Sequence, residues 1–399
     1  MLRALLCVCL SALLLVPAEC WAGSPRIHAH AGAELEQITG RDDRLRLRVE
    51  GIALEFLLQP NEALLHGLGN DRSQRLHAEG YRFWEGEIDR LEGSWVRLSE
   101  VDGRYSGAWF DGTELFLLDP AEEVADLLLE TAKGPHVLYR LSDLELPPFG
   151  DDAIEPKAFA PRAASVGKRM DYRSFADHLG QALGEQAEPR NLVRQLNLTL
   201  VTDTQFSTVH GANRDAVVAT RMNVVDGIYS GQFQTRIGIA QLRHLTDNAN
   251  MTATSGSTLL GEFRTFMTTG AGSSIPKGGL NHLLSGRGFD GNIAGVAYVS
   301  VLCSANSGYG VNRMPNNNNT WSLVVAHEMG HNFGARHDGQ SGSPCESQSG
   351  NWLMSPSING SSTFSPCARD IIQPRINVAT CFVPIQVDPR IFRNGFEAG

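Results

Sequence analysis

The stretch HEMGHNFGARHD, residues 327–338, says more about fold and function than any other part of the chain. Its first half is predicted to lie on a helix over about residues 321–333, where side chains four residues apart share one face. His327 and His331 therefore point at a common centre, and Glu328 stands beside them. Two imidazoles and a carboxylate in this arrangement indicate a metal site.

The residues after this helix are expected to supply a third ligand. Gly334 can take the left-handed conformation that ends a helix and turns the chain back, which returns His337 to the same centre. Three neutral imidazoles leave zinc doubly charged with an open fourth position, which is the pattern of a catalytic site. We expect one catalytic Zn²⁺ held by His327, His331 and His337, with Glu328 as the general base that accepts a proton from water.

Length and charge restrict the class of protein. A chain of 399 residues with 42% hydrophobic residues is long enough for two compact domains. The net charge of -10 gives nucleic acid or an anionic membrane surface no electrostatic attraction. We expect protein or peptide substrates and no nucleic-acid partner, and the oligomeric state stays open.

The N-terminus has the layout of a cleaved secretory signal over residues 1–22. Arg3 is followed by an apolar stretch, residues 4–16, and then by small residues near Ala18 and at 22–23. No later stretch approaches the ~20 apolar residues that cross a bilayer, so we expect a secreted protein with no membrane anchor. Four cysteines lie outside this segment and permit two disulfides in an oxidising compartment, with three pairings open: Cys303, Cys345, Cys367 and Cys381.

Changes of pattern along the chain divide it further. Residues 23–146 contain short alternating runs broken by glycines and read as a β-rich domain, whereas 147–190 read as a linker with processing points and one short helix near 172–183. Residues 191–383 alternate strands and helices, which predicts an α/β (α+β) domain with a mixed, mostly parallel sheet flanked by helices. We expect a C-terminal tail over 384–399. The predicted strands are 195–202, 235–242 and 295–302, the predicted helices are 213–229 and 257–267, and the asparagine run 316–319 is predicted as a surface turn.

The run through His337 resembles the zinc signature of the metzincin metalloproteases. Asp338 directly follows the third histidine, and an Asp at this position resembles the adamalysin (reprolysin, ADAM-like) branch. The resemblance implies that Asp338 supports the ligands without binding the metal. The segment WLMSP, residues 352–356, is similar to the methionine turn of that family. The resemblance implies that Met354 forms an apolar floor beneath the zinc histidines.

Other segments extend the resemblance to this branch. Residues 282–303 are similar to the family segment that forms the edge strand above the substrate cleft, which implies that Gly295, Val296 and Ala297 pair with an extended substrate. Residues 364–367 are similar to the wall of the family's primed-side pocket, and residues 51–107 resemble the reprolysin propeptide. The resemblance implies the disulfides Cys303–Cys381 and Cys345–Cys367, and an enzyme made as a zymogen.

The chain also departs from the family pattern. No cysteine lies between Cys20 and Cys303, so a prodomain cysteine cannot hold the zinc latent. Inhibition of the zinc would then have to come from steric occlusion, a carboxylate or a histidine. His28 and His30 are a conceivable pair of inhibitory histidines, although we expect their segment to be a disordered tail. Glycines stand where the family's calcium-binding Asp would precede His282, so calcium is not expected.

Two other classes of function remain as alternatives. A catalytically inactive binding module on the same fold would normally lack Glu328 or one histidine, and this chain has all four. A structural zinc protein would fill the fourth position, and the chain offers no obvious fourth ligand. We therefore expect a zinc metalloendopeptidase.

Overall fold

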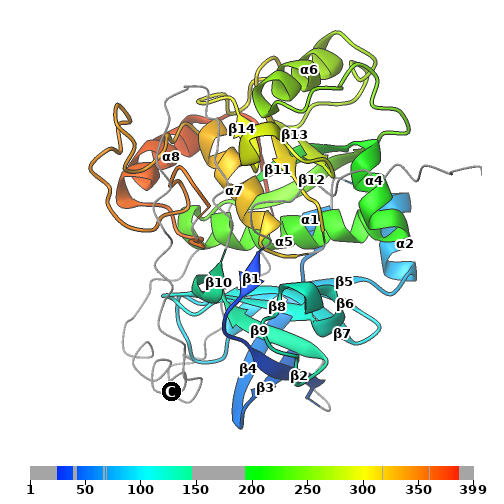
Figure 1. Ribbon diagram of the computed structural model, residues 1–399, viewed down its shortest axis with the longest axis vertical. Helices are drawn as coiled ribbons and strands as arrows, with labels where there is room; N and C mark the ends of the chain where they lie inside the picture. Colours follow the sequence, from blue (N-terminus) through cyan, green and yellow to red (C-terminus); the bar gives the residue numbers. More distant parts are fainter. Residues whose placement is uncertain are drawn as a thin grey trace, which may run out of the picture.

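The structure is a computed structural model. It describes residues 25–385 except 39–42, 66–67, 69, 146–193, 317 and 359. The predicted signal peptide, linker helix and C-terminal tail lie outside the described residues. The described chain forms two units, a β-barrel from the N-terminal part and an α/β unit from residue 194 onward (Figure 1).

The N-terminal unit is a closed barrel of eight antiparallel strands in sequence order. The β-rich prediction is confirmed, and closure leaves the barrel sheet with no free edge, because β2 pairs with both β3 and β9. Its interior is apolar, with Trp109 stacked on Phe116 at 5.6 Å between ring centroids. The strands are β2 (Ala31–Gln37), β3 (Arg44–Val49), β4 (Ile52–Pro60), β5 (Arg82–Ile88), β6 (Trp95–Val101), β7 (Arg104–Phe110), β8 (Leu115–Pro120) and β9 (His136–Arg140).

Short elements flank the barrel. Two helices, α1 (Glu62–Leu65) and α2 (Asn70–Ala78), connect β4 to β5, and β1 (Arg26–Ile27) pairs with β10 (Leu144–Glu145) outside the barrel. The remaining turns are η1 (Ala121–Glu123), η2 (Ala125–Leu127) and η3 (Leu141–Asp143). His28 lies beside Glu145 at 2.5 Å, so the segment expected to be a disordered tail is part of the folded unit. That expectation was wrong because its strand partner lies more than a hundred residues away.

The C-terminal unit contains a mixed sheet in the order β12-β11-β13-β15-β14. The first four strands are parallel and β14 is antiparallel, while β16 pairs antiparallel with β11. The strands are β11 (Arg194–Thr202), β12 (Arg236–His244), β13 (Leu280–Ser285), β14 (Gly295–Ala297), β15 (Tyr309–Arg313) and β16 (Phe382–Pro384). The helices are α4 (Thr204–His210), α5 (Arg214–Phe233), α6 (Gly256–Thr268), α7 (Trp321–Asn332) and α8 (Pro366–Val378), with short turns η5 (Gly211–Asn213) and η6 (Asp290–Asn292).

The predicted strand over 295–302 is only three residues long. After Ala297 the chain leaves the sheet, because Ser300 donates its N–H to His331 O and Val301 donates to Asn332 O, both at 2.9 Å. These bonds satisfy carbonyls at the end of α7 that have no partner within the helix. Capping the helix therefore competes with sheet pairing and shortens β14.

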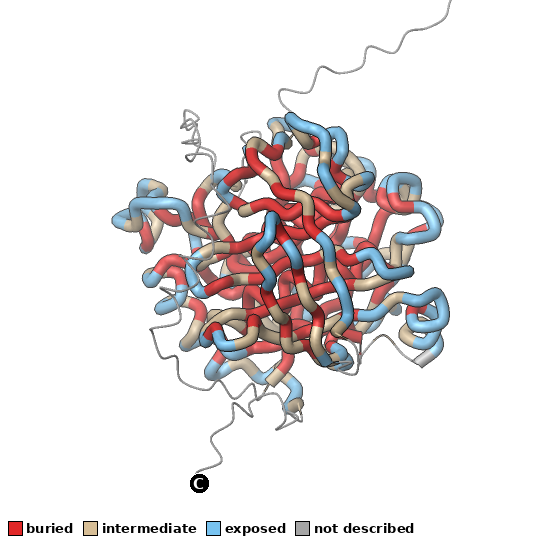
Figure 2. The backbone as a smooth tube through the Cα atoms, turned by 90° about the horizontal axis from the view of Figure 1, so that it is seen from below, coloured by how far each residue is buried: buried red, intermediate tan, exposed pale blue. Residues whose placement is uncertain are grey.

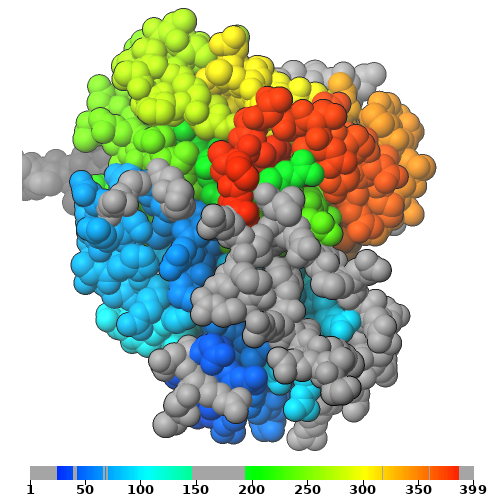
Figure 3. Space-filling view, turned by 180° about the vertical axis from the view of Figure 1, so that it is seen from behind, coloured from blue at the N-terminus to red at the C-terminus, as the bar shows by residue number. Residues whose placement is uncertain are grey.

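Helix α5 lies between the two units (Figure 1). One side of α5 packs on β12 and the other on barrel strands β5, β6 and β7. Buried backbone runs through the interior of the molecule, and exposed stretches lie in the peripheral loops and across the near face (Figure 2). In Figure 3 the blue atoms of the barrel meet the green atoms of the α/β unit directly.

The asparagine run before α7 is not a surface turn. Asn318 is 2% exposed and Asn319 is 0% exposed. The prediction was wrong because the barrel covers this segment, which local sequence cannot show.

Two further observations bear on the setting of the fold. Both disulfides implied by the family resemblance are present, Cys303–Cys381 and Cys345–Cys367. Among the described residues, no helix combines the length and the apolar character needed to cross a membrane.

Candidate metal centre

The three histidines predicted as ligands meet in one place. The Nε2 atoms of His327 and His331 lie 3.1 Å apart, and those of His331 and His337 lie 3.2 Å apart. Two Zn–N bonds of about 2.0–2.1 Å at a tetrahedral angle place their nitrogens roughly 3.3 Å apart. The spacing therefore fits a shared zinc ion, and this trio is a potential metal-binding cluster in the described chain.

Each imidazole is oriented by an oxygen atom at its other ring nitrogen. The Nδ1 atom of His327 lies 2.5 Å from Leu353 O, and that of His331 lies 2.8 Å from Ala335 O. His337 Nδ1 lies 2.8 Å from Gln340 Oε1. Because these oxygens accept hydrogen bonds, each Nδ1 carries the proton and each Nε2 is left with its lone pair facing the centre.

The end of α7 brings His337 back to the helix. Gly334 has φ of 110°, a conformation that side chains rarely adopt, and Ala335 N donates to Gly330 O at 3.0 Å across it. A Cβ at position 334 would lie 2.4 Å from Nε of Arg375. Glycine is thus required for the turn, and a larger residue there would also displace the exposed side chain of Arg375.

The methionine turn holds the histidines from below. Asp338 N donates to Met354 O at 2.8 Å, and the preceding carbonyl, Leu353 O, is the acceptor for His327. Met354 is 0% exposed, and its sulfur lies 2.5 Å from where a Cβ of Gly330 would be. The turn therefore packs against the helix at the residue that precedes His331.

Asp338 connects the centre to α8. Its Oδ1 accepts from Ser365 Oγ at 2.7 Å, and Ser365 in turn caps α8 by accepting from Ala368 N at 3.0 Å. Burial raises the pKa of Asp338, while the Ser365 hydrogen bond and the nearby His327 and His337 act to lower it. The carboxyl group lies behind the ligands and does not join the cluster.

Glu328 is buried beside the histidines, at 1% exposure. A Cβ at Gly295 would lie 2.4 Å from Glu328 Oε1, so only glycine lets β14 pass this close to the carboxylate. A small cavity of about 10 Å³ adjoins the same carboxylate. It has room for about one water molecule. It is lined by Ala294, Gly295, Val324, His327, Glu328, Ser355 and Ile358.

The expected edge strand lies at the end of the sheet. Gly295, Val296 and Ala297 pair with β15 only, so their outer side faces away from the sheet. All three residues are buried. The structure thus brings these residues, the histidines, Glu328 and Met354 into one region.

Several residues of this region were not predicted. Gln340, which orients His337, lies three residues beyond it. This short spacing could have identified Gln340 as a hydrogen-bond acceptor for the third ligand. Val324 and Ile358 line the pocket, and Tyr229 OH donates to Ala326 O at 2.9 Å behind α7. Burial, reinforced by the charge of Glu328, raises the pKa of Tyr229 well above its usual value.

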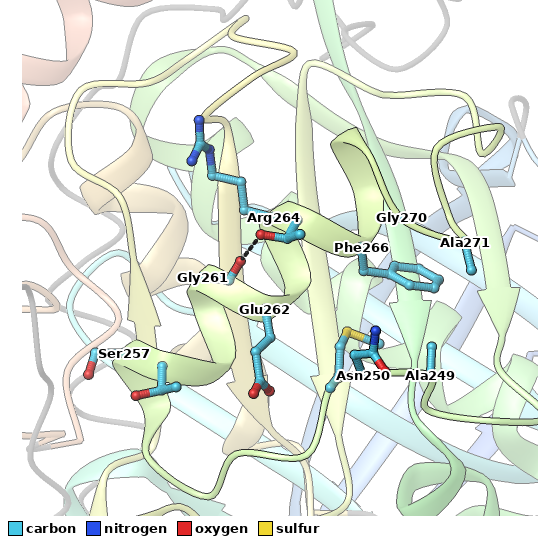
Figure 4. Close-up of a pocket in the computed structure, with 12 residues that line it drawn as sticks. Ala249, Asn250, Ser257, Gly261, Glu262, Arg264, Phe266, Gly270 and Ala271 are labelled. Carbon is cyan, nitrogen blue, oxygen red and sulfur yellow. Dashed lines mark hydrogen bonds between the residues drawn. The ribbon is translucent and has the colours of Figure 1, made fainter.

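A second, wider pocket lies over α6 (Figure 4). Its lining comes from α6 and the flanking loops, and none of it from α7. Glu262, the acidic group of this pocket, accepts backbone N–H bonds from Thr252 and Ala253 at 2.9 and 3.0 Å. This pocket contains none of the predicted site residues.

Comparison with known proteins agrees with this geometry. Residues 193–365 match the profile of metallo-peptidase family M12. The chain is 25% identical to disintegrin and metalloproteinase domain-containing protein 22 of Mus musculus over 271 residues, covering 64% of this chain and 27% of that protein. It is 25% identical to protein 19 of the same series, also from Mus musculus, over 315 residues, covering 74% and 32%.

A snake relative matches a shorter stretch at higher identity. The zinc metalloproteinase-disintegrin-like brevilysin H2a of Gloydius brevicauda is 36% identical over 92 residues, covering 22% of each chain. The chain spans between about a fifth and a third of the length of these relatives. Its α/β unit and three-histidine centre are those of a metalloprotease. Residues 193–365 are a metallo-peptidase unit of family M12, and these relatives support the adamalysin/reprolysin branch.

Proposed function

We propose that the chain is an active, secreted zinc endopeptidase that hydrolyses peptide bonds in proteins. The observation that carries the proposal is the tautomer pattern: all three Nδ1 atoms face oxygen acceptors, and the three Nε2 atoms converge. In this proposal His327, His331 and His337 hold one Zn²⁺. When bound, the ion supplies Lewis-acid activation of water and of the peptide carbonyl.

Glu328 is proposed as the general base. Its carboxylate adjoins the one-water pocket, so it can accept a proton from that water and pass it to the amine that leaves. Its burial excludes competing solvent, which strengthens the attraction between the carboxylate and the proton it holds. Gly295 keeps the strand backbone close to this carboxylate, where an extended substrate would pair with β14.

The remaining roles follow from the surroundings of the ligands. Met354 is proposed as the apolar floor, and Asp338 as a support that holds the turn after His337. Val324 and Ile358, which line the pocket beside Glu328, are proposed to contact the substrate where it approaches this carboxylate. Signal-peptide export, the zymogen form and the domain boundaries belong to the same proposal.

The test compares the full-length chain with Glu328→Gln, which keeps the shape of the side chain and removes its basicity. Zinc content is measured by elemental analysis, and hydrolysis of an unfolded protein is measured before and after the 147–190 segment is cut. We expect one zinc in both proteins and a loss of at least about 10²-fold in rate for the variant. A wild-type protein that binds zinc but cuts nothing in either form would support the inactive binding module. Equal activity in Glu328→Gln would remove Glu328 from the proposal.

A further inference from the structure

The barrel-facing side of α5 is shaped to one side chain of the barrel. Gly227 and Gly231 are four residues apart and so lie on one face of the helix. A Cβ at Gly227 would lie 2.5 Å from the Trp95 ring, and one at Gly231 would lie 2.8 Å from it. Trp95 is 7% exposed and its ring is stacked with Phe110. The two glycines therefore form a seat for the indole.

A closed ring of four charges crosses the same interface. Arg97 Nε lies 2.9 Å from Asp226 Oδ2, and Asp226 Oδ1 lies 3.1 Å from Arg236 Nε. The ring closes through Glu85 Oε2, which is 2.5 Å from Arg236 Nη2 and 3.5 Å from Arg97 Nη2. The barrel contributes one positive and one negative group, and the α/β unit contributes the other two.

All four charged side chains of this ring are buried, with exposures between 0 and 9%. Burial acts to raise the pKa of Asp226, but Arg236 and Arg97 outweigh it and hold the pKa below its ordinary value. Asn61 closes one side by donating to Asn223 Oδ1 at 2.8 Å and accepting from Arg236 at 2.6 Å. Separation of the units would leave each charge with one partner instead of two. Removal of one member of the ring from the assembled protein would leave its partners buried with an uncompensated charge, which is strongly unfavourable, so the assembled interface depends on all four charges.

A third contact joins the barrel to the start of α7. Asn319 Nδ2 donates to Asp119 Oδ1 at 2.7 Å and to Ser106 Oγ at 2.8 Å, both in the barrel. Its Oδ1 accepts from Arg221 of α5 at 2.5 Å. One side chain thus connects the barrel, α5 and the segment that leads into the histidine helix.

The apolar contacts agree with the polar ones. One continuous cluster of buried apolar side chains contains residues of both units. Its barrel members include Phe83, Trp95, Leu117 and Tyr139, and its α/β members include Leu196, Met222, Ile228, Leu323 and Met354. Interfaces between separable domains are usually rather polar, whereas a buried apolar cluster continues across this one.

We propose that the barrel is a permanent part of the folded protein: after cleavage within residues 147–190, it stays bound to the α/β unit and is not released. The glycine-lined side of α5 is therefore permanently covered by the barrel of the same chain. This inference does not depend on peptidase activity, and it distinguishes this chain from a protease whose N-terminal module leaves after processing.

The test uses the full chain with the recognition sequence of a site-specific protease inserted between residues 147 and 190. After complete cutting, the sample is run on size exclusion at dilutions from micromolar to low nanomolar, and its thermal unfolding is followed. We expect both fragments in one peak at the elution volume of the uncut protein, and one unfolding transition. Separate peaks, with an α/β fragment that keeps its circular dichroism and its zinc, would overturn the proposal. The elution volume does not depend on peptidase activity, so failure of the proposed function would leave this proposal intact.

Two arginine variants test the contacts in the cut protein. Arg97→Ala removes one member of the ring, and we expect fragment dissociation to accelerate at least tenfold. Arg82→Ala is the matched control, because Arg82 lies on the neighbouring strand with its side chain 64% exposed. Equal dissociation rates for the two variants would contradict the role of the charge ring. If Arg97→Ala does not fold, the elution of the cut wild-type protein still decides the proposal.

Discussion

The side-chain amide of Asn319 donates to Asp119 of the barrel at 2.7 Å, two residues before the histidine helix begins at Trp321. Replacement of Asn319 by Ala removes this donor and also the acceptor used by Arg221. Because both partners stay buried, we expect the free energy of unfolding to fall by about 2–4 kcal/mol. Urea unfolding measures it. Asn250→Ala is the control, since Asn250 is exposed, and a loss of equal size there would contradict the prediction.

Asp119 makes the stability of the same contact depend on pH. Burial raises the pKa of Asp119 to about 7, against the lowering effect of Arg221 and Tyr139, whereas the value in an unfolded chain is 3.8. Between those two values the folded protein keeps a proton that the unfolded chain has released. The free energy of unfolding should therefore fall as pH rises from about 4 to 7, by up to about 4 kcal/mol from this group, and change little above 7.

The matching variant is Asp119→Asn, which cannot ionise. Urea unfolding of both proteins between pH 5 and 8 gives the difference in stability at each pH. We expect that difference to change with pH up to about 7. A constant difference would show that Asp119 does not titrate in this range.

A methyl group at position 227 is expected to disturb the Trp95 seat. Gly227→Ala places a Cβ 2.5 Å from the indole, so the helix or the ring has to move, at a cost of about 1–3 kcal/mol. Gly261→Ala is the control within α6, where an added Cβ meets nothing within 4 Å and should stabilise the helix by up to about 1 kcal/mol. Thermal unfolding of both variants shows whether each substitution raises or lowers the melting temperature. Stabilisation by both substitutions would refute the close packing of Trp95.

Gln340 is expected to control metal affinity. Its Oε1 is the acceptor that orients His337, so Gln340→Ala should weaken zinc binding by about 10–100-fold. Competition with a fluorescent chelator measures the change. Gln373→Ala, on the exposed contact with Asn377, is the control and should leave the affinity unchanged. Unchanged affinity in Gln340→Ala would mean that His337 needs no side-chain acceptor.

Removal of metal is expected to destabilise the protein. A ligand present at a hundred times its dissociation constant stabilises the folded state by about 2.7 kcal/mol, so chelation should lower the melting temperature. We expect added zinc to restore it and added calcium to have no effect. Full recovery with calcium would contradict the expectation that the chain has no calcium site.

The histidine centre could be predicted because its information is local. His327, His331 and Gly334 lie within two turns of one helix and its end, so helical periodicity and glycine conformation place them without knowledge of the fold. Strands β11 and β12 and helices α5 and α6 were also close to their predicted bounds, since each follows its own apolar pattern, whereas the strand predicted over 295–302 ends at Ala297. The disulfide pairing came from family resemblance and not from the residues alone.

The contacts across the barrel could not be predicted from the sequence. Asn319 lies in a polar run that is typical of a surface turn, and only the barrel, some two hundred residues earlier in the chain, makes it a buried residue. The charge ring has the same cause. Glu85, Arg97, Asp226 and Arg236 each look like solvated charges in their own segments, and their pairing depends on how α5 docks. The acceptor at Leu353 O is a backbone atom, so no side-chain pattern reveals it.

The packing of Met354 has a consequence for chemical durability. Oxidation of a thioether to a sulfoxide adds an oxygen atom and makes an apolar side chain polar. Met354 is 0% exposed, and its sulfur occupies the space beside Gly330 where even a methyl group would collide. Peroxide in the solvent therefore has no exposed surface of Met354 to attack while α7 and the methionine turn stay packed. The proposed floor of the metal centre should thus resist oxidation for as long as the protein stays folded.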